Sequence, residues 1–264
     1  MQLQEIYIYP IKSLGGIRLQ EAQVEVRGLT YDRRWMLVDD KGLFLTQRKH
    51  HHMALLQVDL QPSGLRVYHK HNPERQCFVP FSPKSGQSIK VTVWDDTVDA
   101  LVVSEEVSQW FTGILGISCQ LVFMPEATSR PIDEKYAVHQ ETVSFADAMP
   151  YLLIGQSSLD DLNNKLEEAV PMNRFRPNFV FTGAAAFEED TWSQIKIGTC
   201  TFKITKPCAR CVMTTVDQET GTSGKEPLKT LASYRSVNKK VLFGQNMIAL
   251  TGGKIKIGDQ LTPL

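Results

Sequence analysis

The sequence predicts a mostly β protein, a barrel or sandwich with α/β elements and a few short helices. Many short segments that alternate apolar and polar residues follow one another at close spacing, which favours antiparallel strands over βαβ units. Few segments carry the apolar spacing of an amphipathic helix. The 264 residues, 42% hydrophobic and 22% charged, are an ordinary globular composition and suffice for one large domain or two modest ones.

The first half of the chain is predicted to consist of strands and hairpins. Residues 39–42, with the sequence Asp-Asp-Lys-Gly, form a good hairpin turn, and residues 95–97 form a second one. The strands predicted around these turns are residues 6–10, 18–27, 31–38, 43–46, 55–79 in several short pieces, 90–94 and 98–103.

Three segments further along show helical patterns. Residues 104–115 begin with a serine suited to N-capping and place their apolar side chains on one face. Residues 158–169 repeat this pattern with Ser157 or Ser158 as the cap, and a short helix is predicted at residues 227–235. The strands predicted beside these helices are residues 179–182, two within 192–204, 212–216 and the alternating tail 248–264. A polar loop is expected at residues 125–140.

Charge and cysteine usage exclude several classes of function. Lys and Arg number 29 and so do Asp and Glu, so the formal net charge is zero, and we expect neither nucleic acid nor an anionic membrane as a partner. No stretch approaches the roughly 20 apolar residues of a membrane span, and the first residues lack the basic start of a signal peptide. Five cysteines, an odd number, then suggest reduced thiols in the cytoplasm.

The most informative short motif is Cys208-Ala209-Arg210-Cys211, which follows Lys206. The neighbouring cations favour the charged form of a thiol and are expected to lower its pKa. Because β-branched residues follow, the motif is predicted to hold a thiolate at the end of a strand. A thiolate is both a nucleophile and a soft metal ligand, so a redox dithiol, a zinc site and a site for another metal are all candidates.

Each candidate makes a different demand on the sequence. A redox dithiol normally opens a helix, which the residues after Cys211 do not favour. Structural zinc needs about four ligands, and Cys77, Cys119 and Cys200 form no second half-site. A pair of small buried residues is the structural alternative, and it accounts for neither the arginine nor the basic residues before the motif.

Cations stand at three other predicted strand ends, namely Lys12 with Ser13, Arg33, and Arg176 with Asn178. Each has a structural alternative as a solvated turn or a strand-entry cap. Lys12-Ser13 lacks the glycine-rich lead-in of a phosphate loop. The basic run at residues 48–52 adds positive charge, although its three histidines are expected on a solvated face. These cations and Cys211 could converge on one phosphorylated, metal-bearing ligand.

Several motifs occur in the order found in a known family. The sequence resembles the MOSC-domain molybdenum proteins, in the branch that includes the mitochondrial amidoxime-reducing component. The resemblance implies an N-terminal MOSC-type β-barrel domain at residues 1–120 and a β-barrel MOSC domain with a few short helices at residues 121–264. The motifs that carry it are Tyr9-Pro10-Ile11-Lys12-Ser13, Tyr31-Asp32-Arg33-Arg34-Trp35, Phe145-Ala146-Asp147, Asn173-Arg174-Phe175-Arg176-Pro177-Asn178, Glu189-Asp190-Thr191-Trp192 and Lys206-Pro207-Cys208-Ala209-Arg210-Cys211.

The family implies a molybdenum cofactor, a molybdopterin dithiolene with a terminal phosphate. Cys211 would be the catalytic cysteine and the metal ligand. The residues implied to bind the rest of the cofactor are Lys12, Ser13, Arg33, Asp147, Arg176, Asn178, Ala209 and Arg210. Soft sulfur suits molybdenum, and basic side chains suit a phosphate. Pyridoxal phosphate is not expected.

The implied activity is reduction of N-hydroxylated compounds such as hydroxylaminopurines, amidoximes and hydroxylamines. Two departures from the family bear on it: Ala148-Met149 replaces a Thr-Ser pair, so only backbone contacts are expected there, and no ferredoxin-like domain follows Leu264. Electrons are therefore expected from a separate ferredoxin, flavodoxin or reductase. The alternative is a non-enzymatic carrier of the cofactor, or of sulfur as a persulfide on Cys208 or Cys211.

Overall fold

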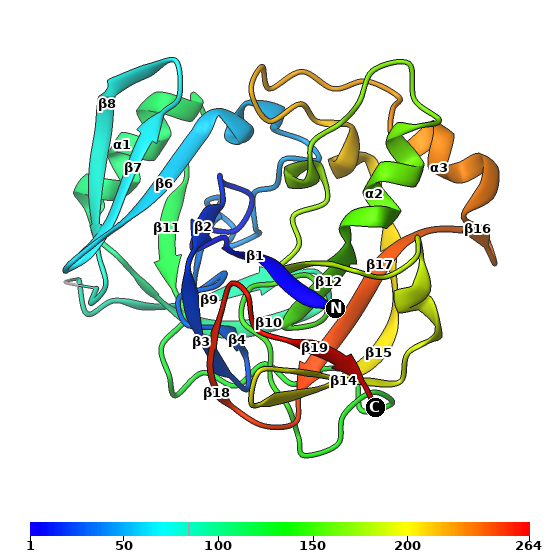
Figure 1. The fold of residues 1–264 in the computed structure, drawn as a ribbon. Coiled ribbons are helices and arrows are strands. Elements are labelled where there is room, and N and C mark those ends of the chain that lie inside the picture. The colour runs from blue at the N-terminus through cyan, green and yellow to red at the C-terminus, as the bar shows by residue number, and fades with distance from the viewer. Residues whose placement is uncertain (84) are drawn as a thin grey trace.

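The largest sheet of the computed structural model, which describes residues 1–83 and 85–264, contains nine strands. Their order is β19-β14-β15-β17-β12-β13-β1-β2, and the short β16 pairs with β17 (Figure 1). The strands are β1 (Gln2–Ile8), β2 (Ile17–Leu19), β12 (Tyr151–Gly155), β13 (Phe179–Thr182), β14 (Gln194–Ile197), β15 (Cys200–Arg210), β16 (Ser236–Val237), β17 (Lys240–Ala249) and β19 (Leu261–Pro263).

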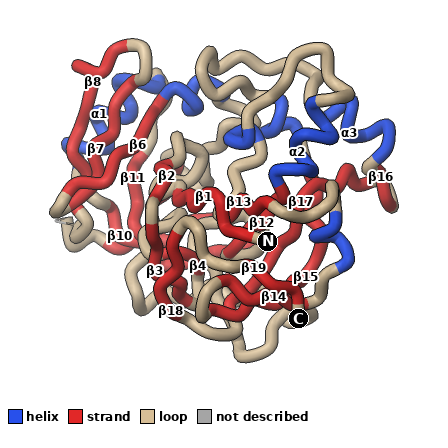
Figure 2. Tube along the Cα trace, viewed as in Figure 1, coloured by secondary structure: helices blue, strands red, loops and turns tan. Residues whose placement is uncertain are grey.

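In the described ranges the remaining strands form three smaller sheets (Figure 2). One has the order β5-β11-β10-β9, a second β18-β3-β4 and a third β6-β7-β8. Their strands are β3 (Glu21–Glu25), β4 (Gly28–Leu29), β5 (Trp35–Val38), β6 (Leu56–Gln61), β7 (Gly64–His69), β8 (Asn72–Pro80), β9 (Ser88–Val93), β10 (Asp96–Val102), β11 (Gln120–Phe123) and β18 (Gly253–Lys256). The mostly β prediction is confirmed, and strand pairing closes none of these sheets into a barrel within the described residues.

Strands from the two ends of the chain pair with each other. β1 runs antiparallel to β13, with Ile6 opposite Phe179, and β3 pairs with β18, with Ala22 opposite Ile255. The apolar cluster behind the large sheet therefore combines early residues such as Leu3 with late ones such as Phe202. The expected division of the chain near residue 120 stays a prediction.

The three α-helices are α1 (Glu105–Leu115), α2 (Gln156–Asn163) and α3 (Leu228–Tyr234) in the described part of the chain. The hydroxyl of Ser104 accepts from the amide of Val107 and caps α1, as predicted. The capping prediction for α2 is wrong, because Gly155 is the N-cap and the Ser158 hydroxyl donates to the buried carboxylate of Glu189. The 3-10 helices among the described residues are η1 (His51–Leu55), η2 (Met172–Arg174), η3 (Glu188–Thr191) and η4 (Val212–Thr215).

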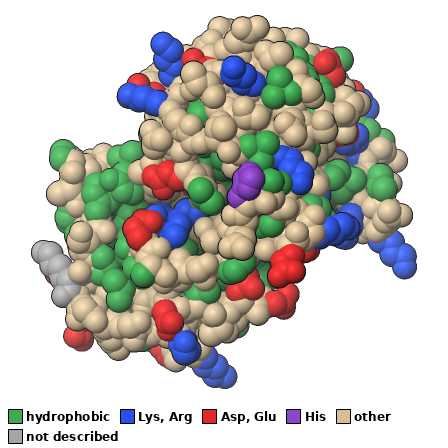
Figure 3. All heavy atoms as spheres, turned by 90° about the horizontal axis from the view of Figure 1, so that it is seen from below, with side chains coloured by type: hydrophobic (Ala, Val, Ile, Leu, Met, Phe, Trp, Pro, Cys, Tyr) green, Lys and Arg blue, Asp and Glu red, His purple; other side chains and the backbone are tan. Residues whose placement is uncertain are grey.

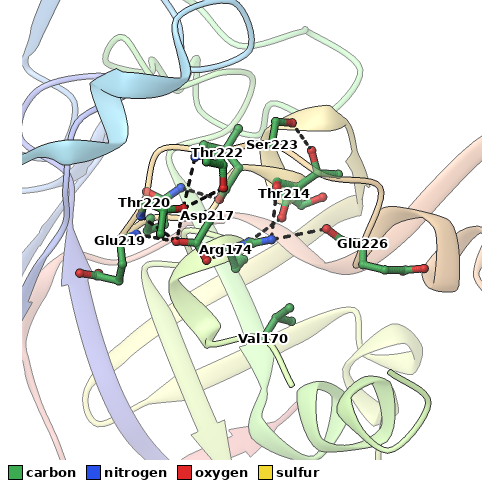
Figure 4. A network of polar contacts seen from close by, with 12 residues as sticks. Val170, Arg174, Thr214, Asp217, Glu219, Thr220, Thr222, Ser223 and Glu226 are labelled. Atoms are coloured by element: carbon green, nitrogen blue, oxygen red, sulfur yellow. Dashed lines mark hydrogen bonds and ion pairs between the residues drawn. The ribbon is translucent and has the colours of Figure 1, made fainter. Parts of the chain in front are cut away.

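The strand predicted at residues 212–216 is also wrong, since β15 ends at Arg210 and η4 follows. The hydroxyl of Thr214 donates to the carbonyl of Cys211 at 3.0 Å, and that of Thr215 to the carbonyl of Val212 at 2.8 Å. Such local side-chain bonds compete with strand pairing. Arg174 lies about 40 positions earlier in the sequence and also stabilises this turn, because its guanidinium donates to the carbonyls of Thr214 and Thr215 (Figure 4).

Candidate active site

One cavity of about 550 Å³ brings together every site residue that the sequence singled out. It lies where the end of β15 faces the loop after residue 144, the start of β13 and the turn after β1. The predicted residues that line it are Lys12, Ser13, Arg33, Asp147, Arg176, Asn178, Ala209, Arg210 and Cys211. Their convergence in space is thus a feature of the fold, while their roles toward a ligand stay predictions.

Cys211 lies directly after β15 and receives a hydrogen bond from a residue distant in sequence. The Nε of Arg48 donates to its Sγ at 3.2 Å. Sequence reasoning had placed Arg48 only within a basic run and gave it no role in the site. No local pattern could have shown this contact, because the two residues are 163 positions apart.

Asp147 gathers the cations around this thiol. Its carboxylate accepts from Lys12 Nζ at 2.6 Å, Arg48 Nη2 at 2.8 Å and Trp94 Nε1 at 3.2 Å. Burial alone would raise the pKa of Asp147, but Lys12 and Arg48 outweigh it and hold that pKa well below its usual range. Asp147, which was expected to bind the cofactor, therefore fixes the positions of Lys12 and Arg48.

Lys12 is almost fully buried, with its Nζ also bonded to the carbonyl of Phe145 at 2.6 Å. Burial lowers the pKa of Lys12 to about 8, although Asp147 opposes that shift. Arg130, which the sequence analysis did not name, holds the same loop by donating to the carbonyls of Ser144 and Ala146. These bonds give the loop after Ser144 a fixed path along the cavity.

The opposite wall carries two arginines, only one of which is paired with a carboxylate of the described chain. Arg33 and Arg176 both lie against the ring of Tyr9, at 4.3 Å and 4.2 Å from its centre. Arg33 pairs with Asp32 at 2.6 Å, whereas the guanidinium of Arg176 has no hydrogen bond or ion pair among residues 1–83 and 85–264. Arg176 is 7% exposed, and burial lowers its pKa to about 10. A buried cation without a partner is costly, so this wall is suited to an anion.

Two further buried donors in the cavity also lack partners within the described chain, namely Ser13 Oγ and Arg210 Nη2. The remaining nitrogens of Arg210 donate to the carbonyls of Phe243 and Phe175, at 2.8 Å and 2.9 Å. Arg210 is therefore fixed by the protein with one donor left over for a ligand.

Three of the site residues have a strained backbone. Ser13, Arg33 and Arg176 have φ values of 68°, 51° and 53°, in the left-handed region that residues with a side chain rarely adopt. Each such residue costs about 1–3 kcal/mol and usually persists at functional sites. The clustering of these residues at one cavity supports a binding role.

Asn178 has a mainly structural role, because its amide is already bonded. Its Oδ1 accepts from the amide of Leu152 at 3.2 Å, and its Nδ2 donates to the carbonyl of Tyr7 and to Asp32, both at 3.2 Å. These bonds tie β1, β12 and the start of β13 together beneath the cavity. Asn178 therefore positions Arg33 and its partner Asp32.

The two cysteines of the motif differ in their surroundings. Both line the cavity, and the pairing of β15 shifts between Pro207 and Ala209, just before Cys211. Burial raises the pKa of Cys208 even though Arg210 opposes it, so the predicted lowering is wrong for this thiol. Lys206 lies over the ring of Tyr136 at 4.5 Å.

Arg174 stabilises the fold and is not available to a ligand in the cavity. Besides the two carbonyls of η4, its guanidinium donates to Asp217 at 2.9 Å and to the carbonyl of Glu226 at 3.4 Å (Figure 4). All of its donor nitrogens thus have protein partners. This contrast with Arg176, two residues later, separates a structural arginine from one available to a ligand.

The donor set fits the group that the sequence resemblance implies. Arg176, Ser13 Oγ and Arg210 Nη2 offer an anion the partners that the protein itself does not supply. Residues 1–83 and 85–264 contain no group of three or more His, Cys, Asp or Glu side chains placed to hold a metal ion. A metal here would need ligands from a cofactor beside Cys211, as a dithiolene provides.

One face of the molecule carries charged side chains of both signs. Lys, Arg, Asp and Glu side chains are interspersed on the face seen in Figure 3, in keeping with a formal net charge of zero. None of the helices described for this chain combines the length and apolar character needed to cross a membrane.

Two family models together match most of the chain. The model described as MOSC N-terminal beta barrel domain matches residues 1–118, and the MOSC domain model matches residues 140–262. The second match contains the cysteine motif and the loop that carries Asp147. The first contains Lys12, Arg33 and Arg48, so both matches contribute to the cavity.

Curated relatives are similar over nearly the whole chain. The chain is 32% identical to mitochondrial amidoxime-reducing component 1 of Mus musculus, over 97% of this chain and 80% of that protein. It is 33% identical to mitochondrial amidoxime reducing component 2 of Bos taurus, over 97% of this chain and 81% of that protein. It is 30% identical to a molybdenum cofactor sulfurase of Oryza sativa subsp. japonica, over 92% of this chain and 32% of that protein.

Proposed function

The chain belongs to the MOSC-domain family, with an N-terminal MOSC β-barrel domain ahead of the MOSC domain, and from this premise we propose that it is a molybdenum-cofactor-dependent reductase of N-hydroxylated compounds. The observation that carries the proposal is one cavity that contains both Cys211 and Arg176, a buried cation without a partner among the residues that the structure describes. The substrates would include hydroxylaminopurines, amidoximes and hydroxylamines. The names of the amidoxime-reducing relatives support this choice.

Each group in the cavity has a distinct part in holding the cofactor. Cys211 Sγ would bind the metal, with Ala209 beside it as part of the cavity wall. Arg176, Ser13 Oγ and Arg210 Nη2 would bind the phosphate and the polar edge of the pterin. When bound, the cofactor supplies two-electron redox chemistry, and the protein contributes orientation and electrostatics.

Reduction of an N–OH group consumes two electrons and two protons and releases water. Lys12 Nζ lines the cavity and, with a pKa of about 8, holds a proton at neutral pH. Its bonds to Asp147 and Phe145 keep that proton at a defined place. The electrons would come from a separate ferredoxin, flavodoxin or reductase, because the sequence lacks a dinucleotide-binding fingerprint. A cytoplasmic location also stays a prediction.

A carrier of the cofactor or of sulfur is the second candidate. It is favoured by the presence of two thiols, Cys208 and Cys211, in one cavity, either of which could hold a persulfide. A relative named molybdenum cofactor sulfurase gives it further support, although the chain spans only 32% of that protein.

One preparation distinguishes these functions. Protein purified from a host that makes the cofactor should contain molybdenum and pterin in near-equal amounts. It should also reduce an N-hydroxylated base with an artificial electron donor, and do so poorly with reduced nicotinamide alone. Stoichiometric zinc without molybdenum would overturn the cofactor assignment. Cyanide-labile sulfur on a protein that reduces none of these substrates would favour the carrier.

A further inference from the structure

Arg48 is held in place from several sides at once. Its Nη2 pairs with Asp147 at 2.8 Å, its Nη1 donates to the hydroxyl of Thr46 at 3.2 Å, and its guanidinium lies 4.7 Å from the ring centre of Trp94. The planar group is thereby fixed in orientation, with only 18% of the side chain exposed. The remaining donor, Nε, points at Cys211 Sγ at 3.2 Å.

The partners of Arg48 are themselves fixed. Asp147 is bonded to Lys12 and Trp94, and its backbone carbonyl accepts from Arg130 at 3.2 Å. The sulfur therefore meets a cationic donor whose position does not depend on a bound ligand. This donor comes from the segment matched by the N-terminal barrel model, whereas Cys211 lies in the MOSC domain match.

We infer that Arg48 is a positioning residue that orients the Cys211 sulfur and sets the reduction potential of the metal bound to it. This rests on the proposed function, in which that sulfur is a metal ligand. A hydrogen bond from a cation draws electron density from the sulfur, so the sulfur donates less to the metal and the reduced state gains stability. The N-terminal segment then tunes the metal centre as well as binding the cofactor.

The test measures the potential of the molybdenum-loaded protein by a spectroscopic redox titration. Arg48→Gln should shift the potential to more negative values by about 30 mV or more, equivalent to a tenfold change for a two-electron couple. Arg48→Lys keeps a cation for Asp147 but loses the planar donor, so a smaller shift in the same direction is expected. If the Arg48→Gln protein does not fold, the Arg48→Lys protein decides the test.

Arg66→Gln is the matched control. Arg66 also lies in the N-terminal segment and pairs with a carboxylate, Asp59, but does not line the cavity. The substitution changes the net charge equally and should leave the potential unchanged. A wild-type potential in loaded, folded Arg48 variants would overturn the inference, as would an equal shift in Arg66→Gln.

The result also separates this inference from the proposed function. If the wild-type protein holds molybdenum and reduces the substrate while the Arg48 variants keep its potential, only the role of Arg48 fails. If the wild-type protein holds no molybdenum, both fail together.

Discussion

Arg176 and Arg174 are close in sequence but differ in whether the protein supplies partners for their guanidinium groups. The guanidinium of Arg174 is bonded on every side, whereas that of Arg176 is buried without a partner in the part of the chain described here. Folding gains from the first arrangement and loses from the second, because an unpaired buried charge is destabilising. Binding of an anion would offset the cost of Arg176. This makes it the residue at which stability and ligand binding conflict most clearly.

Arg176→Met should therefore release the cofactor without weakening the fold. In the cofactor-free protein we expect the free energy of unfolding to stay within about 0.5 kcal/mol or to increase. Arg174→Met is the matched control and should lower it by about 2–3 kcal/mol, since four bonds are lost. Urea unfolding and molybdenum analysis measure both effects. A loss of several kcal/mol in cofactor-free Arg176→Met would show that this arginine is structural.

The pKa of Lys12 is expected to make both cofactor retention and the free energy of unfolding depend on pH. Its pKa falls from 10.5 to about 8 in the fold, so the native side chain loses its charge as the pH rises through about 8. Cofactor retention should be steady below that pH and fall above it, because the attraction for the anion disappears. Between pH 8 and 10.5 the unfolded chain binds more protons, so this group's contribution to the free energy of unfolding rises with pH.

Lys12→Arg tests this assignment, since arginine keeps its charge throughout the range. Molybdenum content after dialysis at a series of pH values should decline above pH 8 in the wild-type protein and much less in the variant. The same decline in both would mean that another group controls retention.

The element that shapes the cavity is β15, together with the turn that follows it. Its partner β17 contains Gly244, which has a φ of 77°. An added Cβ there would lie 2.7 Å from Ile154 Cγ1 and 2.8 Å from the carbonyl oxygen of Leu153. It would also come within 3.4 Å of Arg210 Nη2. This close approach of β12 and β17 keeps Arg210 against the cavity.

Gly244→Ala should lower the free energy of unfolding by about 2 kcal/mol or more, from the left-handed backbone and the overlap combined. Gly113→Ala is the control, because a Cβ there meets nothing within 4 Å and the residue lies within α1. That change should stabilise the protein by about 0.5–1 kcal/mol. Urea unfolding of both variants decides the matter, and equal effects would contradict the packing of β12 against β17.

Sequence patterns predicted elements whose causes are local. The cap of α1 at Ser104 needs only the next few residues, and so does the hairpin of β9 and β10, although its turn is Trp94-Asp95 rather than the predicted residues 95–97. The strand predicted at residues 43–46 is wrong, since only an isolated bridge joins Phe44 to Val38. The predicted strand after Cys211 failed because the Thr214 and Thr215 hydroxyls bond to carbonyls within the turn, and because Arg174, about 40 positions earlier, binds the carbonyls of these two residues. Arg48 was missed for the same reason, as its contact with Cys211 depends on the whole fold. The motif resemblance identified the other cavity residues, but it could not show that the amide of Asn178 is already bonded or that Arg176 is unpaired.

At the scale of the molecule, the two segments that match different family models share sheets and the cavity. β1 and β2 complete the large sheet, whose other strands come from the second half of the chain, and the late strand β18 pairs with β3. Lys12, Arg33 and Arg48 line the same cavity as Cys211. A ligand in the cavity would therefore be bound by both segments. Its loss is expected to weaken the contact between them.

The pairing also predicts how the protein unfolds. Cofactor-free protein should unfold in one transition, with circular dichroism and tryptophan fluorescence changing together. A fragment of residues 121–264 lacks β1 and β3, which pair with β13 and β18, and should not fold alone. Two separate transitions, or a stable fragment, would show that the halves are independent domains.

The central claim is that Cys211 alone among the cysteines binds the metal of a molybdenum cofactor in this cavity. Molybdenum content and substrate reduction should be measured for the wild-type protein, Cys211→Ser and Cys208→Ser, all purified from a host that makes the cofactor. Cys211→Ser should lose substrate reduction and most of the metal. Cys208→Ser should keep much of both at a modest cost in stability, because its thiol lacks the bond from Arg48. Equal losses in the two variants would contradict the account and favour a site that needs both sulfurs.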